Sequence, residues 1–235
     1  MQRLSMAGVT LVLVLAAFPS WAASGAPGVS ADEALSKLVE GNARFVAGSL
    51  LHPDQDAARR QDTGANGQHP FAVVLTCADS RVPPEVVFDQ GLGDLFVVRV
   101  AGNVAATDEI GSIEYAADHL GSALVVVLGH TKCGAVTAVV KKEPTTPSIG
   151  KLVAPIAPAV ARVKKQFPSA GPDEIISKSV EANVWQAMAD MHATSALLKR
   201  LEAQGKVKIV GAIYDVDSGQ VRFLGEHPQK AARLN

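Results

Sequence analysis

The sequence predicts a single α/β domain with a mainly parallel β-sheet, helices flanking the sheet, and an antiparallel strand at its C-terminal edge. Apolar runs recur along the chain without the alternation of half-exposed strands, and helical patterns lie between them. Such alternation of strand and helix is typical of parallel β-α-β units. With 48% hydrophobic and 19% charged residues, the 235-residue chain has the composition and length for one globular core.

Four apolar runs are predicted to be buried strands, and a short segment near the C-terminus is predicted to be the antiparallel edge strand. Part of each run is β-branched, and each lacks alternation, which is typical of strands covered on both faces. The runs span residues 71–76, 95–100, 123–128 and 207–216, and a turn at 218–219 leads to the last strand, 220–224. The sheet therefore accounts for most of the expected core.

Helix signals separate these strands in the first half of the chain. Ser30 and Glu33 form a capping box ahead of a helix with one apolar face. The polar segment 50–70 predicts a loop with a short helix. Thr107 is expected to cap the helix that precedes the third strand.

The second half begins with a helix that Cys133 opens. Prolines recur at intervals over residues 144–158, so we expect regular structure to be interrupted in this stretch. One long helix is then expected over 172–203, because helical spacing continues until Gly205. No internal repeat or second domain is evident.

The N-terminal segment 1–22 is expected to be a signal peptide. A basic residue precedes the apolar run 6–18, and the small residues Ser20 and Ala22 occupy the −3 and −1 positions of a cleavage site. An uncleaved anchor needs about 20 apolar residues, more than this run supplies. We therefore expect a mature domain over 23–235, a periplasmic location, and no membrane attachment after cleavage.

The charge balance argues against nucleic acid as a partner. The chain has 22 basic and 23 acidic side chains and a formal net charge of −1. It therefore lacks the basic field that attracts phosphate backbones or anionic lipid.

Two polar clusters directly follow predicted strands: 77–81 after the first and 130–134 after the third. Sites in parallel sheets gather at the carboxyl ends of strands, so we expect these clusters to face each other. Cys77, His130 and Cys133 then supply two thiols and an imidazole, a donor set that suits tetrahedral Zn²⁺ and leaves one position open. The alternative for an exported protein is a disulfide between the two cysteines.

Asp79 and Arg81 lie beside this proposed metal site. Asp79 is two residues from Cys77 and could fill the fourth position. However, the planar fork of Arg81 can hold the carboxylate and turn it away. We favour an open site in which Asp79, kept ionised by Arg81, accepts a hydrogen bond from zinc-bound hydroxide. This bond aims the lone pair of the hydroxide oxygen at a compact electrophile such as CO₂. An ordinary surface ion pair is the alternative.

Together with the motifs at 41–45 (Gly-Asn-Ala-Arg-Phe) and 98–103 (Val-Arg-Val-Ala-Gly-Asn), these clusters carry a family resemblance. The sequence resembles the β-class carbonic anhydrases over most of the mature chain. The resemblance implies reversible hydration of CO₂ to bicarbonate and a proton, with one Zn²⁺ per subunit. It assigns the zinc ligands as Cys77, His130 and Cys133, and the catalytic dyad as Asp79 and Arg81.

The resemblance also implies a self-associating enzyme, because the family places its active site between two subunits. A homodimer or an assembly of dimers is therefore expected. Gln68, Phe96 and Tyr115 match, by spacing, residues that line the substrate pocket in the plant-like branch, and Gly134 offers a backbone N–H to an anion. Without the resemblance, the sequence favours a purely structural interpretation of the first three: a loop amide, a core ring and a ring on a helix face. Val74 replaces the Trp of the bicarbonate-regulated branch, so we expect a site that stays open over a wide pH range.

Two other functions remain open at the level of sequence. A related zinc enzyme could hydrolyse COS or CS₂ with the same donor set. Alternatively, a disulfide between Cys77 and Cys133 could staple a noncatalytic exported binding protein. Comparing the turnover of CO₂ and COS distinguishes a carbonic anhydrase from the first alternative. Titration of free thiols, together with metal analysis, distinguishes a zinc enzyme from the second.

Overall fold

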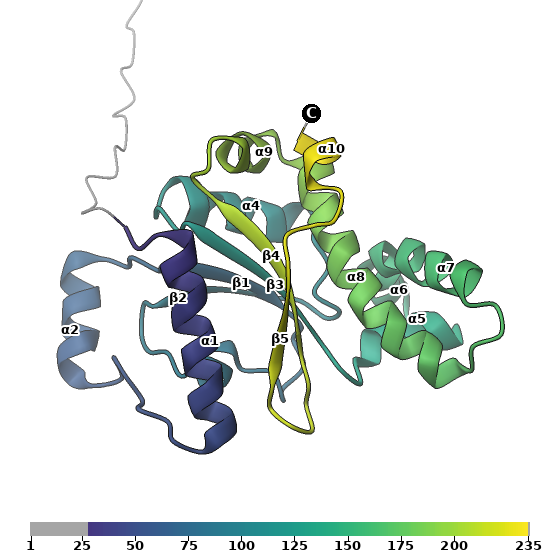
Figure 1. The fold of residues 1–235 in the computed structure, drawn as a ribbon, viewed down its shortest axis with the longest axis horizontal. Helices are drawn as coiled ribbons and strands as arrows, with labels where there is room; N and C mark the ends of the chain where they lie inside the picture. Colours follow the sequence, from purple (N-terminus) through teal and green to yellow (C-terminus); the bar gives the residue numbers. More distant parts are fainter. Residues whose placement is uncertain (1–27, 235) are drawn as a thin grey trace, which may run out of the picture.

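A computed structural model describes residues 28–234, which form one five-stranded sheet with helices on both faces (Figure 1). The strand order is β2-β1-β3-β4-β5. The first four strands in chain order are parallel, and β5 is antiparallel to β4. The strands are β1 (Ala72–Thr76), β2 (Leu95–Arg99), β3 (Leu124–His130), β4 (Lys208–Tyr214) and β5 (Val221–Gly225). The predicted fold class is confirmed.

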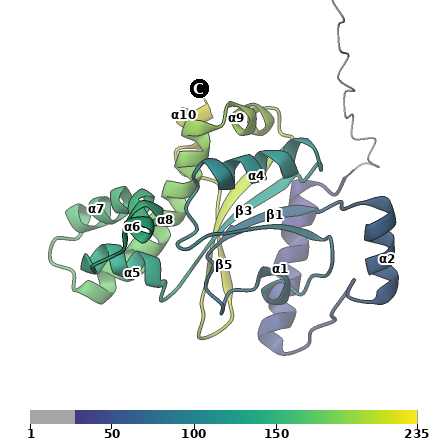
Figure 2. The ribbon, with the colours of Figure 1, turned by 180° about the vertical axis from the view of Figure 1, so that it is seen from behind.

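Helices cover the two faces of the sheet and create two apolar cores. One core lies beneath α1 and α3, and the other beneath α4, α5, α7, α8 and α9 (Figures 1 and 2). The α-helices are α1 (Ala31–Ala47), α2 (Ala57–Asn66), α3 (Pro84–Val87), α4 (Thr107–Asp118), α5 (Gly134–Lys141), α6 (Pro147–Val153), α7 (Ala157–Gln166), α8 (Pro172–Thr194), α9 (Ala196–Ala203) and α10 (Lys230–Leu234). The sheet is therefore buried from both sides.

The central strands explain why the sequence showed continuous apolar runs. Every residue of β1 and β3 is buried. Val73 of β1 packs into the core beneath α8, whereas its neighbour Val74 packs into the core beneath α1. Because both faces of these strands are covered, both need apolar side chains, and the sequence shows no alternation of apolar and polar residues.

Helix α1 begins at the predicted cap, where Ser30 and Glu33 form the capping box. Gly41 lets this helix approach the end of α3 closely, since a Cβ there would lie 1.8 Å from the backbone oxygen of Phe88. The next residue, Asn42, donates to the Val87 carbonyl at 3.1 Å and accepts from the Val221 N–H at 2.8 Å. The 41–45 motif therefore joins α1 to the rest of the fold.

Two predicted helix boundaries are wrong. The helix expected over 172–203 is interrupted at Ser195, whose extended backbone ends α8 and whose hydroxyl caps α9 by accepting from the Leu198 N–H. A serine side chain that can bond to nearby backbone competes with helix continuation. Thr107 is the first residue of α4 rather than its cap; Ala106 takes the cap position, and its N–H donates to the Glu109 carboxylate.

The proline-containing stretch is more helical than the sequence indicated. It folds into α6, a 3₁₀ turn at Ala154–Ile156, and α7. Pro147, Pro155 and Pro158 each lie in the first turn of one of these pieces. Proline is tolerated there because its missing N–H has no partner within the helix anyway. The prolines therefore begin short helices.

The predicted signal peptide, 1–22, lies outside the described residues. Within 28–234, no helix is both long enough and apolar enough to cross a membrane.

Candidate active site and metal centre

The predicted zinc ligands meet at the carboxyl ends of two neighbouring strands. Cys77 directly follows β1, His130 is the last residue of β3, and Cys133 is the N-cap of α5. Their candidate ligand atoms all lie within 4.8 Å of one another, and all three residues are buried. The structure therefore brings together the three residues that the sequence placed after different strands.

The loop between two of these ligands is held in a turned conformation. Lys132 has a φ of +58°, in the left-handed region that non-glycine residues rarely adopt. The Thr131 N–H donates to the Tyr214 carbonyl at 2.9 Å, and the Thr131 hydroxyl accepts from the Val216 N–H at 3.0 Å. The end of β4 thus anchors the loop that carries His130 and Cys133.

His130 is oriented as a metal ligand. Its Nδ1 lies 2.9 Å from the Thr131 carbonyl oxygen, so Nδ1 carries the hydrogen and donates it. This leaves Nε2 with a free lone pair, and Nε2 is buried without a hydrogen-bond partner within residues 28–234. A buried polar atom is normally paired, and one beside two thiol groups fits a metal ion.

The two cysteines have the chemistry of metal ligands. Both lie in the described chain, and neither forms a disulfide. A hydrogen bond from Cys133, together with the one from the Gly102 N–H, lowers the pKa of Cys77. The same contact, together with burial, raises the pKa of Cys133. The contact between the two sulfurs therefore favours deprotonation of Cys77, and the thiolate is the form of cysteine that binds metals.

Asp79 is held beside this centre by Arg81. The guanidinium donates through Nε to Oδ1 at 2.9 Å and through Nη2 to Oδ2 at 2.8 Å. These hydrogen bonds hold the pKa of Asp79 well below its ordinary value. Oδ2 lies 3.9 Å from Nε2 of His130, yet the carboxylate is not part of the three-residue ligand cluster. A tetrahedral ion held by these three residues would have one position left for water or substrate.

A residue without a role predicted from the sequence supports the segment carrying Cys77 and Asp79. Arg99, at the end of β2, donates through Nε to the Cys77 carbonyl at 3.2 Å and through Nη2 to the Asp79 carbonyl at 2.6 Å. Its place in the 98–103 motif was visible in the sequence. The strand register that puts Arg99 opposite Thr76 was not.

The predicted substrate-pocket residues lie at different distances from this centre. Gly134 is exposed at the start of α5, directly after Cys133. Gln68 is exposed and precedes the amino end of β1, whereas Cys77 follows the carboxyl end. Phe96 and Tyr115 contact each other, with ring centroids 6.2 Å apart. Phe96 pairs with Val73, four residues before Cys77 in the sheet, a separation of about 13 Å along a strand. One chain does not bring Gln68, Phe96 and Tyr115 to the ligands.

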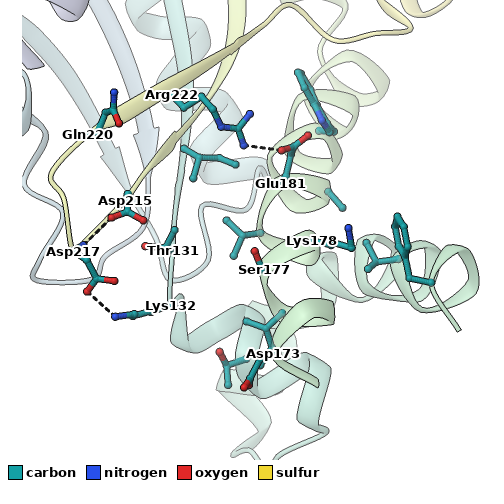
Figure 3. Close-up of a pocket in the computed structure, with 18 of the residues that line it drawn as sticks. Thr131, Lys132, Asp173, Ser177, Lys178, Glu181, Asp215, Asp217, Gln220 and Arg222 are labelled. Atoms are coloured by element: carbon teal, nitrogen blue, oxygen red, sulfur yellow. Dashed lines mark hydrogen bonds and ion pairs between the residues drawn. The ribbon is translucent and has the colours of Figure 1, made fainter. Parts of the chain in front are cut away.

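A groove of about 1220 Å³ lies on another side of the ligand loop, between the β4–β5 hairpin and α8 (Figure 3). Thr131 and Lys132 line it, but Cys77 and Asp79 do not. Ion pairs lie along its wall, including Arg222–Glu181 at 2.9 Å and Lys132–Asp217 at 2.6 Å. The groove is therefore separate from Asp79 and from the three candidate ligands, none of which lines it.

Comparisons with known proteins agree with this geometry. The family model described as carbonic anhydrase matches residues 72–221, which include all three ligands and the Asp79–Arg81 pair. Carbonic anhydrase 2 of Mycobacterium tuberculosis is 40% identical over 205 residues, which cover 86% of this chain and 96% of that protein.

Solved structures show the same relationship. The β-carbonic anhydrase CafA of Aspergillus fumigatus is 30% identical, with a TM-score of 0.66, and the match covers 86% of this chain and 96% of that one. A tetrameric β-carbonic anhydrase of Sordaria macrospora has the same TM-score at 21% identity, covering 72% of this chain and 87% of that one, and shows likeness of fold.

Proposed function

The chain belongs to the β-class carbonic anhydrases, and from this membership we propose a zinc enzyme that reversibly hydrates CO₂ to bicarbonate and a proton. In this proposal Cys77, His130 and Cys133 hold the metal, and Asp79 and Arg81 form the catalytic dyad. One observation carries the assignment: a buried imidazole nitrogen that has no hydrogen-bond partner among residues 28–234 lies beside the two cysteine sulfurs. An ionised carboxylate lies 3.9 Å from that nitrogen.

Zinc bound by these three residues supplies a Lewis acid that lowers the pKa of a water molecule. Asp79 accepts a hydrogen bond from the attacking oxygen and orients its lone pair toward the carbon of CO₂. Arg81 keeps Asp79 ionised and restrains both carboxylate oxygens, so Asp79 acts as an acceptor rather than as a fourth ligand. Gly134, at the start of α5, offers its N–H to the bicarbonate product, since the first amides of a helix lack partners within it.

The assay that tests this activity uses chain 23–235 with measured zinc content. We expect CO₂ hydration in proportion to bound zinc, and slower turnover of COS and CS₂. Faster turnover of COS or CS₂ than of CO₂ would reassign the substrate while leaving the metal site intact. Full zinc occupancy without turnover of any of the three would reject the enzymatic role.

A homodimer, alone or within an assembly of dimers, is the second part of the proposal. Gln68, Phe96 and Tyr115 lie away from the ligands of their own chain, so they serve a substrate pocket only if a second copy brings them there. The tetrameric assembly of the Sordaria macrospora relative supports self-association. Sedimentation should give an even-numbered oligomer, and a Tyr115→Ala variant should raise KM. A fully active monomer would contradict this assembly.

Export to the periplasm is the third part, supported by the charge, length and small-residue pattern of segment 1–22. Cell fractionation should find a protein that begins at Ala23 in the periplasmic fraction. Recovery of the uncleaved chain in the cytoplasm would reject it.

A further inference from the structure

We propose that Asn183 of α8 is a positioning residue for the metal centre. It fixes the backbone amide that donates a hydrogen bond to the sulfur of Cys77. The inference deepens the proposed function and rests on it, because it concerns the same zinc site. Asn183 lies 106 residues beyond Cys77, on a helix that contributes none of the three ligands.

Two hydrogen bonds made by the backbone of Gly102 connect α8 to Cys77. The Gly102 N–H donates to Sγ of Cys77, with 3.2 Å between nitrogen and sulfur. The carbonyl of the same Gly102 accepts from Nδ2 of Asn183 at 2.7 Å. Asn183 therefore restrains the residue whose amide contacts the sulfur, without touching the sulfur itself.

Gly102 needs an external anchor because it lies in an irregular segment and has no side chain. Its φ is +79°, and a Cβ would lie 2.6 Å from Cδ1 of Ile156. Only glycine fits this conformation and this packing. Since the segment after β2 has no helix or strand hydrogen bonds at this point, its position depends on contacts such as the one from Asn183.

The location of Asn183 is itself informative. It is only 2% exposed, and its helix neighbours Val180 and Val184 belong to the apolar core. Helix α8 packs against β3 and β4 at this point (Figure 1). An amide among such residues loses its water and is stable only when hydrogen-bonded. An apolar side chain would avoid that cost, so the amide is explained by the carbonyl that it binds.

The consequence concerns the metal–sulfur bond. Partners that hydrogen-bond to a ligand orient it and tune its donor strength, and their loss typically costs 10- to 100-fold in metal affinity. An amide hydrogen bond to sulfur withdraws electron density from the thiolate. Without Asn183, Gly102 is free to move away, and the sulfur becomes both less oriented and more electron-rich.

Asn42 provides a matched control, since it is also a buried asparagine, 5% exposed. Its side chain bonds the Val87 and Gly219 carbonyls and the Val221 N–H. None of these groups belongs to the ligand cluster or contacts Cys77. Asn42→Leu removes a buried amide of the same size, and with it support for the fold rather than for the metal site.

The experiment compares Asn183→Leu with Asn42→Leu in the full zinc-loaded enzyme. One readout is the rate of zinc release to a chelator, and the other is the sulfur-to-metal charge-transfer band after substitution by Co²⁺. For Asn183→Leu we expect zinc release about 10- to 100-fold faster than in the parent and a band shifted to lower energy. For Asn42→Leu we expect lower thermal stability with parental zinc release and spectrum.

Each outcome decides the inference. Parental zinc release and spectrum in Asn183→Leu would overturn it, and so would equal changes in both variants. If Asn183→Leu does not fold, Asn183→Ser replaces it, because the serine side chain is too short to reach Gly102. Asn183→Gln, which keeps an amide, should restore part of the zinc retention. If the parent itself binds no zinc, the proposed function fails first, and that result is distinct from failure of the role of Asn183.

Discussion

Two aspartate–arginine pairs in this protein have similar chemistry and different surroundings. Asp89 pairs with Arg44 at 2.6 Å, and Asp79 pairs with Arg81 at 2.8 Å. The Asp89 carboxylate is 1% exposed and also accepts the N–H groups of Leu51 and His52, each at 3.0 Å. All of its partners belong to α1 or to the loop that follows it.

The Asp79 carboxylate is 18% exposed, and within the described part of the chain all of its hydrogen bonds come from Arg81, through Nε, Nη2 and the backbone N–H. It faces Nε2 of His130 rather than another loop. The difference shows how one pair of residue types serves two purposes. The Asp89 carboxylate accepts backbone hydrogen bonds that hold a loop in place. The Asp79 carboxylate can still accept a further hydrogen bond beside the candidate metal ligands.

The largest expected effect is on catalysis in Asp79→Asn. The amide loses the negative charge that accepts the proton of the nucleophile, so kcat for CO₂ hydration should fall by about 100-fold or more. Zinc content and melting temperature should stay close to those of the parent, since Asp79 is not a ligand and is partly exposed. Stopped-flow hydration with metal analysis measures this. A parental rate in the zinc-loaded variant would show that Asp79 does not orient the nucleophile.

Asp89→Asn should have the opposite profile. Breaking a buried ion pair by removing one partner leaves the other unpaired and costs about 3 kcal/mol. For a chain of this size, that corresponds to a melting temperature roughly 6–12 °C lower. Turnover per bound zinc should be unchanged. Calorimetry at fixed protein concentration measures the melting temperature. If Asp89→Asn instead lost turnover and kept its stability, the two pairs would not differ in role.

The pH dependence of stability sharpens the comparison further. Burial opposes ionisation of Asp89, but hydrogen bonds from Arg44, Leu51 and His52 outweigh it and lower its pKa below the ordinary 3.8. A carboxyl whose pKa is lowered by folding contributes stability above its unfolded pKa and loses it as pH falls through the folded pKa. The stability difference between parent and Asp89→Asn should therefore be constant from pH 7 to about 5 and shrink below about 4. A difference that does not shrink would contradict the ionised pair.

The smallest expected effects come from lysine substitutions. Arg81→Lys keeps the charge but loses the two-pronged contact with Asp79, so kcat should fall about 10-fold, less than in Asp79→Asn. Arg44→Lys should lower stability by only about 1 kcal/mol, because a cation and both backbone donors remain around Asp89. Parallel rate and unfolding measurements test both. Equal loss of turnover in the two variants would mean that the arginines do not differ in role.

The same two pairs show what the sequence could and could not predict. Asp79 and Arg81 are two residues apart at the end of an apolar run, so their interaction followed from local geometry. Arg44 and Asp89 are 45 residues apart and meet only because Gly41 lets α1 approach the backbone at Phe88. Local pattern thus predicted the sheet and the meeting of the three candidate zinc ligands, since strands and their ends are encoded by contiguous residues.

Features that depend on packing were missed or placed incorrectly. The break at Ser195 follows from one hydroxyl that bonds backbone, and helical spacing alone continues across it. The hydrogen bonds from Gly102 to Cys77 and from Asn183 to Gly102 join the end of β1, the segment after β2, and α8. No residue spacing in the sequence indicates such a connection.

Native mass spectrometry of the parent chain and of Cys77→Ser tests the central claim most directly, because it reports bound zinc and the oxidation state of the cysteines together. The metal centre described above predicts one zinc per parent chain with both cysteines unlinked. It predicts no retained zinc in Cys77→Ser, since a hydroxyl is a poor replacement for a thiolate. A Cys77–Cys133 disulfide without zinc in the parent, or full zinc occupancy in Cys77→Ser, would contradict it.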